Sequence, residues 1–301
     1  MVPVVTFIVH GLTSRKPKLF RLIDKVFGND FEIKVKQTTE IHPADFLATE
    51  ALAEGTDYLI AVGGDGTVNE VVNAYLDSEP QKEVPIGIFP QGRGNDFVKS
   101  VGIQKSLKSL FWAIQNKQVK SVDVGYVTFF GPDKKELNRY FINIADIGIG
   151  GLATKMIRIS PKFLGPNITY FWAIIKSLIS YKSHIVKIST PDWCYEGDVL
   201  SVCMANGKYF GSGLCIAPDA EVDDGISEIV LIGNVRVWDY LAKIPHLKKG
   251  KKINHSEVSY QQARSCTITS KNPMPIDMDG EFVGFTPLEM VILPKKVKIL
   301  V

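Results

Sequence analysis

Residues 63–67 read Gly-Gly-Asp-Gly-Thr and lie between an apolar run, 58–62, and a helical pattern, 68–77. Glycine lets a backbone approach a phosphate closely, and a helix N-terminus offers free N–H groups at a positive dipole end. For the glycines alone, a tight turn that needs positive φ explains the pattern equally well. Asp65 favours a phosphate site with Mg²⁺, because a carboxylate beside a phosphate is repulsive unless a cation bridges the two.

A second polar turn, Gln-Gly-Arg-Gly-Asn-Asp-Phe at 91–97, follows the next apolar run, 84–89. In a doubly wound sheet the turns at the carboxyl ends of the strands form the ligand site, so we expect the two turns to converge. The first turn contains neither GxxxxGK[ST] nor a full GxGxxG, which disfavours a P-loop protein and a dinucleotide dehydrogenase.

Acidic residues gather at two later points of the chain. Asp277, Asp279 and Glu281 surround Gly280 and would share one face of a strand, where a cation or solvent must relieve their repulsion. A solvated hairpin is the alternative, since Asp-Gly pairs form turns. The segment 217–225 holds four more acids, and an oxygen-ligated ion competes there with an ordinary acidic turn.

The elements that position these turns differ between the two parts of the chain. Residues 1–123 alternate short apolar strands with helical patterns, which predicts an α/β domain with a doubly wound parallel sheet. Its expected strands and helices are strands 4–9, 31–36, 58–62 and 84–89, and helices 20–27, 68–77, 105–116 and one that begins with Pro43 at its first position.

Residues 124–301 contain short β-branched and aromatic runs broken by Gly, Pro, Asn and Asp, which predicts a β-rich, antiparallel, sandwich-like domain. The expected strands are 122–130, 140–149, 184–190, 199–205, 226–232, 264–269, 276–285 and 288–301. A helix at 167–181 interrupts them, and its apolar face serves either as core or as a membrane-docking face. Short crossings near 122–126 predict an active-site cleft between the domains.

Composition sets further bounds. The 301 residues suit two domains, and 45% hydrophobic and 22% charged residues are ordinary for a globular protein. A net charge of +3 is too small to indicate nucleic acid. The four cysteines and five histidines form no zinc pattern or disulfide framework, which indicates a reduced, intracellular protein. The opening residues resemble no signal peptide, and we expect no transmembrane segment.

Five segments, in this order, resemble the diacylglycerol kinase catalytic-domain family, which includes bacterial soluble diacylglycerol kinases, YegS-like lipid kinases, and sphingosine and ceramide kinases. They are GGDGTVNE (63–70), GRGNDF (92–97), YFGSG (209–213), PDAEVDDG (218–225) and DGE (279–281). The resemblance covers essentially the whole chain. It implies an ATP- and Mg²⁺-dependent transfer of the γ-phosphoryl group to a lipid hydroxyl, with diacylglycerol or a related lipid as acceptor.

The resemblance also assigns residues. Glu281 matches the family's proposed general base, with Asp279 beside it and Asp65 close to the phosphates and Mg²⁺. Asp224 would hold a structural Mg²⁺ through its side chain, helped by the backbone carbonyls of Glu221 and Ile226. The implied ATP-binding set is His10, Gly11, Leu12, Thr13, Ser14, Thr39, Gly63, Gly64, Asp65, Gly66, Thr67, Val68, Asn69, Glu70, Arg93, Asn95 and Asp96.

Two departures from the family pattern leave rival readings open. The loop His10–Ser14 replaces the usual Asn-Pro ahead of Ser-Gly, and Arg93 replaces an ATP-contacting Thr. Arginine either strengthens phosphate binding or obstructs it. The rivals are an NAD kinase-like small-molecule kinase, which shares a GGDG loop, and an inactive nucleotide- or lipid-binding protein.

A lipid acceptor implies work at a membrane surface. The basic run Lys248, Lys249, Lys251 and Lys252 would attract anionic lipid at about 1 kcal/mol per charge, unless it is simply a solvated loop. We therefore expect a cytoplasmic protein in peripheral contact with membrane. Strand edges in the β-rich domain make a homodimer a further expectation.

Overall fold

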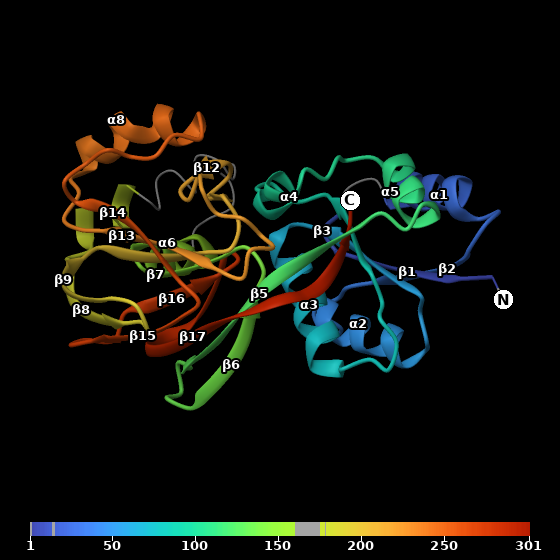
Figure 1. The fold of residues 1–301 in the computed structure, drawn as a ribbon. Helices are drawn as coiled ribbons and strands as arrows, with labels where there is room; N and C mark the ends of the chain where they lie inside the picture. The colour runs from blue at the N-terminus through green and yellow to red at the C-terminus, as the bar shows by residue number, and fades with distance from the viewer. Residues whose placement is uncertain (1, 14–15, 160–174, 178) are drawn as a thin grey trace. The chain divides into compact units, whose positions relative to one another are not determined.

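A computed structural model describes residues 2–13, 16–159, 175–177 and 179–301 (Figure 1). The chain forms two compact units, one of residues up to Asp123 together with Lys295–Val301, the other of Val124–Pro294. We expected the second domain to continue to residue 301. The last seven residues instead join the first unit, because Ile299 pairs with Ile86 there and the N–H of Lys295 donates to buried Asp123 at 2.6 Å.

The first unit is an α/β domain with a parallel sheet, as predicted. The strand order is β17-β4-β3-β1-β2, where β17 contributes only its carboxyl end. The strands are nearly continuous apolar runs, which is typical of a sheet covered on both faces. Their bounds are β1 (Val4–Val9), β2 (Glu32–Gln37), β3 (Tyr58–Gly63), β4 (Ile86–Pro90) and β17 (Glu281–Leu300).

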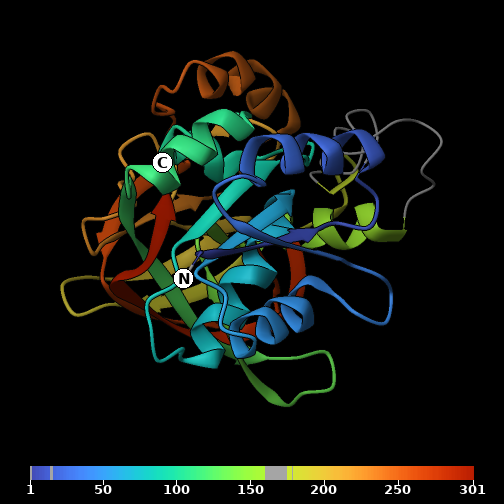
Figure 2. The ribbon, with the colours of Figure 1, turned by 90° about the vertical axis from the view of Figure 1, so that its right-hand side faces the viewer.

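Five helices belong to the first unit. Helices α1 and α5 pack together over one face of the sheet, and α2 and α3 pack together over the other (Figures 1 and 2). Pro43 is the residue before α2 rather than its first residue. Helix α4 was not predicted, since six residues are too few to show a helical period. The bounds are α1 (Lys16–Phe27), α2 (Ala44–Ala53), α3 (Asp65–Ser78), α4 (Asp96–Val101) and α5 (Leu107–Gln115).

The second unit is β-rich, and its paired strands are antiparallel, as predicted. The main path is β14-β13-β10-β7-β16-β17, and further strands attach to it. One apolar cluster includes Ile147, Met204, Ile276 and Leu288. The strands not yet given are β5 (Val119–Phe130), β6 (Glu136–Phe141), β7 (Ile144–Gly148), β8 (His184–Ser189), β9 (Cys194–Val199), β10 (Ser201–Ala205), β11 (Tyr209–Phe210), β12 (Leu214–Cys215), β13 (Ser227–Ile232), β14 (Val258–Ala263), β15 (Ser265–Ser270) and β16 (Pro275–Met278).

Two helices of the second unit were not predicted, α6 (Ile149–Ile159) and α8 (Val237–Lys248). The predicted helix at 167–181 lies mostly outside the described residues, within which 175–177 and 179–180 are helical. No helix in the described part of the chain is long and apolar enough to cross a bilayer.

Candidate active site

Four loops of the first unit meet at the carboxyl edge of its parallel sheet. Val9 lies opposite Gln37 on β2 and Val62 on β3, and Gly63 lies opposite Pro90 on β4. The four strands therefore end together, and the loops that follow them begin at one edge. These loops carry the residues that the sequence assigned to a nucleotide.

The glycine-rich turn after β3 has only one residue, Gly64, that belongs to neither the strand nor the helix. Strand β3 ends at Gly63, helix α3 begins at Asp65, and Gly64 between them has extended backbone with φ −99°. None of Gly63, Gly64 and Gly66 has positive φ, so the alternative of a left-handed turn is wrong. The glycines instead permit close approach: a Cβ on Gly64 would lie 3.1 Å from the Cα of Gly92, and a Cβ on Gly92 would overlap Gly64.

Hydrogen bonds join the two polar turns, as expected for turns that converge. The carbonyl of Gly63 accepts from the N–H groups of Gln91 at 2.7 Å and Gly92 at 3.0 Å. Asn95, in left-handed backbone, donates through Nδ2 to the carbonyl of Gly92 at 2.8 Å. The second turn is thus held in place by the end of β3.

Asp65 sits at the centre of this arrangement. Its Oδ1 accepts from the N–H of Phe97 in the first turn of α4 at 3.2 Å. A Cβ on Gly94 would lie 3.0 Å from Oδ2 of Asp65 and 3.2 Å from Oδ2 of Asp96, so the two carboxylates flank Gly94. Asp96 is buried and pairs with Lys99 at 2.8 Å. Mg²⁺ in kinases uses one or two carboxylates and completes its shell with phosphate oxygens and water, so this pair fits the ion.

Arg93 lies on the same turn and is exposed. Within the described residues it has no hydrogen-bond or ion-pair partner. Since an arginine guanidinium matches the geometry of phosphate oxygens, its five N–H donors are available for a phosphate ligand.

The loops after β1 and β2 also touch. The N–H of Gly11 donates to the hydroxyl of Thr38 at 2.8 Å, and a Cβ on Gly11 would lie 2.6 Å from the Thr38 carbonyl oxygen. The hydroxyl of Thr39 accepts from the N–H of His42 at 3.0 Å. The predicted residues His10, Gly11, Leu12, Thr13 and Thr39 therefore lie on these two loops, whereas Ser14 is outside the described residues.

The predicted residues further along α3 make packing contacts. Thr67, Val68 and Asn69 are buried. The carboxylate of Glu70 accepts from the N–H of Ala44 at 2.9 Å and so caps α2, an interaction that stabilises a helix start. A nucleotide role for these four residues remains a prediction.

The acidic hairpin of the second unit differs from the predicted strand face. Strand β16 ends at Met278 and β17 begins at Glu281, while Asp279 and Gly280 form the turn with φ of 51° and 90°. The expectation that Asp277, Asp279 and Glu281 share one face is therefore wrong, because two residues with positive φ reverse the chain between them.

Asp279 holds this turn against the segment between β6 and β7. Its Oδ2 accepts from the N–H of Ile142 at 2.9 Å, and its Oδ1 accepts from Asn143 and Ile144 at 3.0 Å each. Three amide donors satisfy a buried carboxylate well. The observed contacts make Asp279 a residue that positions its neighbour Glu281.

Glu281 forms an ion pair that the sequence did not predict. Its Oε2 lies 2.8 Å from Nη2 of Arg139 on β6, and both side chains are partly exposed. The two residues are 142 positions apart, so only the fold brings them together. The pair orients a carboxylate that is still partly exposed to solvent.

Two buried carboxyls face each other beside the hairpin. Asp277 on β16 is paired in register with Asp146 on β7. Burial raises the pKa of Asp277 to about 7. The negative charge of Asp146 raises this pKa further, whereas the hydrogen bond from Thr154 lowers it. Burial also raises the pKa of Asp146 to about 6, although Cys203 and Ser201 donate to it. The sequence analysis did not identify Asp146 as a candidate site residue, because a single carboxyl within an apolar strand forms no motif or spacing.

Two protein families match successive parts of this chain. The diacylglycerol kinase catalytic domain matches residues 5–127, and the YegS C-terminal NAD kinase beta sandwich-like domain matches residues 145–301. The chain belongs to the diacylglycerol kinase family of lipid kinases. Membership implies ATP as phosphate donor.

Curated relatives agree with this assignment, and a solved structure shares the fold. The lipid kinase is 29% identical to a diacylglycerol kinase of Staphylococcus epidermidis, over 97% of this chain and 90% of that one. It is 27% identical to a diacylglycerol kinase of Bacillus subtilis, over 94% and 90%. A crystal structure of a diacylglycerol kinase from Bacillus anthracis shares the fold with a TM-score of 0.72, over 99% and 96% of the chains at 20% identity.

The acidic segment of the lipid kinase, residues 217–225, forms backbone and ion-pair contacts within its own unit. Asp224 accepts from the N–H of Ile226 at 2.9 Å, Asp219 pairs with Lys252, and Glu221 is exposed. No three His, Cys, Asp or Glu side chains gather as metal ligands among the residues that the structure describes. The structural Mg²⁺ at Glu221, Asp224 and Ile226 remains a prediction that uses one carboxylate and two carbonyls.

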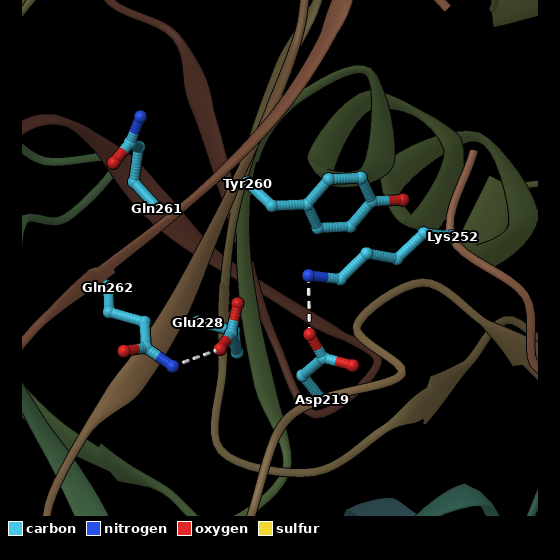
Figure 3. A pocket seen from close by; sticks show the side chains of 6 residues that line it. All are labelled: Asp219, Glu228, Lys252, Tyr260, Gln261 and Gln262. Atoms are coloured by element: carbon cyan, nitrogen blue, oxygen red, sulfur yellow. Dashed lines mark hydrogen bonds and ion pairs between the residues drawn. The ribbon is translucent and has the colours of Figure 1, made fainter. Parts of the chain in front are cut away.

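A polar pocket of about 340 Å³ lies beside this segment (Figure 3). Nζ of Lys252 pairs with Asp219 and lies 5.1 Å from the centre of the Tyr260 ring, so Lys252 is committed to the pocket. Buried Glu228 accepts from Gln262 at 2.5 Å. Of the four lysines in the predicted basic run, only Lys248, Lys249 and Lys251 are therefore available to contact a membrane.

Proposed function

We propose that this lipid kinase transfers the γ-phosphoryl group of ATP to a hydroxyl of diacylglycerol or a related lipid, with Mg²⁺ as cofactor. The observation that carries the proposal is the pair of interlocked turns, in which Gly63 and Gly64 meet Gly92 and two carboxylates flank Gly94. Phosphoryl transfer depends mainly on positioning and charge neutralisation, which such a site supplies.

The first unit binds the donor in this proposal. Asp65 and Asp96 would hold Mg²⁺, which supplies charge neutralisation on the phosphates when bound. The exposed guanidinium of Arg93 contacts a phosphate oxygen, where the family pattern has a threonine. Gly11, Thr13 and Thr39 on the loops after β1 and β2 line the nucleotide.

The second unit supplies the base. Glu281 accepts the proton of the lipid hydroxyl as the hydroxyl oxygen forms its bond to phosphorus and the bond to ADP breaks. Arg139 and Asp279 act through Glu281, the first by an ion pair and the second by holding the turn. We place the kinase in the cytoplasm, a location supported by its four unpaired cysteines.

The test is turnover of γ-labelled ATP against a panel of lipids in mixed micelles. We expect labelled diacylglycerol or a related lipid from wild type, its loss in Asp65→Asn, and a fall of about 10²- to 10⁴-fold in Glu281→Gln. Glu289→Gln, on the exposed side of the same strand β17, and Asp77→Asn, on the exposed side of α3, are the matched controls. Unchanged turnover in Glu281→Gln would exclude it as the base.

One observation favours a second candidate, a binding protein without turnover. Arg93 stands where the family has a small hydroxyl, and a phosphate held too firmly does not transfer. ATP binding without product from any lipid, with turnover gained in Arg93→Thr, would support it. Labelled dinucleotide in place of lipid would instead indicate the NAD kinase-like rival.

A further inference from the structure

Helix α8 of the second unit exposes an apolar stripe. Trp238, Ala242 and Pro245 follow each other at the spacing of one helix face, Lys249 at the C-cap continues that face, and all four are exposed. Trp238 is 78% exposed, a large exposed fraction for the largest apolar side chain. Figure 1 shows α8 along the outside of its unit. The stripe therefore has no cover from the described residues.

The opposite face of α8 holds the helix to its unit. Leu247 is buried in a cluster with Ile216, Ala217 and Val230, and Ile244 packs against that cluster. Burial also raises the pKa of the Tyr240 phenol to about 12. Because this face satisfies the packing of the helix, the exposed tryptophan is not needed for the fold.

Positive charge is concentrated at the same place. The segment 236–252 contains six Lys and Arg and one acid, a net +5, whereas the whole chain carries only +3. Two of the six cations are committed, Lys252 to Asp219 and Lys243 to the carbonyl of Asn254. Lys248, Lys249 and Lys251 are exposed, and their ammonium groups have no partner within the described residues. They extend the stripe at its carboxyl end.

We propose that α8 is the membrane-docking element, lying flat on an anionic bilayer. Trp238 enters the boundary between headgroups and acyl chains. Lys248 and Lys249 contact lipid phosphates about 16 Å further along the helix, and Lys251 does so just beyond the end of the helix. Exposed lysines complement an anionic surface, and tryptophan prefers the interface between water and lipid. This docking does not depend on the kinase reaction, because it uses none of the residues assigned to it.

A second segment with similar composition provides a matched control. Helix α5 exposes Trp112 at 61%, and Lys105, Lys108 and Lys117 lie around it. The neighbours of Trp112 on the exposed side are polar, Ser109, Gln115 and Asn116, whereas those of Trp238 are Ala242 and Pro245. Each segment thus has one exposed tryptophan and three exposed lysines, and the apolar stripe distinguishes α8 in this comparison.

The experiment is sedimentation of the full chain with vesicles of phosphatidylcholine alone or of equal parts phosphatidylcholine and phosphatidylglycerol. We expect binding to the anionic vesicles only, weakened by salt. Changing Lys248, Lys249 and Lys251 together to Gln should weaken it on the order of 100-fold, from about 1 kcal/mol per charge. Trp238→Ala should weaken it about 10-fold, and Trp238→Phe less.

The matched variants decide the proposal. Lys105, Lys108 and Lys117 changed together to Gln, and Trp112→Ala, should leave binding unchanged; an effect of these with none from the α8 variants would overturn the assignment. Quenching of Trp238 by brominated acyl chains, lost in Trp238→Phe, should show insertion, and its absence would overturn it. In detergent micelles the α8 variants should turn over lipid like wild type. A loss in micelles as well would indicate misfolding, which circular dichroism checks.

Discussion

Asp277→Asn should make the kinase more stable at neutral and alkaline pH. Asp277 and Asp146 are 6% and 1% exposed on neighbouring strands, and burial raises the pKa of Asp277 to about 7. An asparagine has the size and neutrality of the protonated acid. In the wild type Asp277 accepts hydrogen bonds from the N–H of Gly280 and the hydroxyl of Thr154. The asparagine can accept the first with its amide oxygen and can replace the second by donating from its amide nitrogen to the Thr154 hydroxyl.

The sign follows from the two pKa values. An ordinary aspartate has a pKa of 3.8, and the folded protein holds that of Asp277 at about 7. Between about pH 4 and about pH 7 the unfolded chain loses its proton while the folded protein keeps it, so the free energy of unfolding falls as the pH rises. The difference between these two pKa values corresponds to about 4 kcal/mol of stability. Part of the shift is the charge of Asp146, so we expect about 2 to 4 kcal/mol of stabilisation by Asn above pH 7, and none near pH 4.

Urea unfolding across this pH range, followed by circular dichroism, measures the effect. Asp198→Asn, an exposed change on β9 of the same unit, is the control and should leave the pH slope unchanged. A variant less stable than wild type at every pH would show that the fold uses the ionised carboxylate, and the reasoning from burial would be refuted.

Two further predictions concern the proposed active site. Gly92→Ala places a methyl against Gly64 and must separate the two turns, so nucleotide binding measured by calorimetry should weaken at least about 10-fold. Gly55→Ala strains a backbone with φ of 82° but has open space around its Cβ, so it controls for a loss of stability and should leave nucleotide binding unchanged. Unchanged affinity in Gly92→Ala would show that the turns do not form the phosphate site. Arg139→Gln removes the partner of Glu281, so kcat should fall about 10-fold with KM for ATP unchanged. Arg139→Lys should recover part of that loss, and an equal effect of both variants would indicate a purely structural arginine.

The strands and turns of the first unit could be predicted because they depend on residues that are neighbours in the sequence. The run 58–62 is apolar throughout and ends in glycines, so both the parallel strand β3 and the turn after it could be placed. The reason for the glycines could not be read, because a close approach between Gly64 and Gly92 and a positive φ both require glycine.

Long-range pairing accounts for what the sequence did not show. Strand β14 reads VSYQQA, a polar run at the end of the sheet path whose strand character depends on its pairing with β13. Arg139 and Asp146 lie far along the chain from Glu281 and Asp277, and a single charged residue carries no period. We predicted one acidic strand face at Asp277, Asp279 and Glu281, whereas the chain turns at Asp279. The sequence could not distinguish the two, because an Asp-Gly pair is compatible with a turn as well as with an acidic face.

The return of residues 295–301 to the first unit affects how this protein is made. During synthesis residues up to 123 emerge first, but Lys295 and Ile299, which bind Asp123 and pair with Ile86, leave the ribosome only after the whole second unit. The unit that we propose to bind the phosphate donor is thus completed last. A truncated translation product lacks the strand that closes its sheet beside β4, and it exposes an unpaired apolar edge.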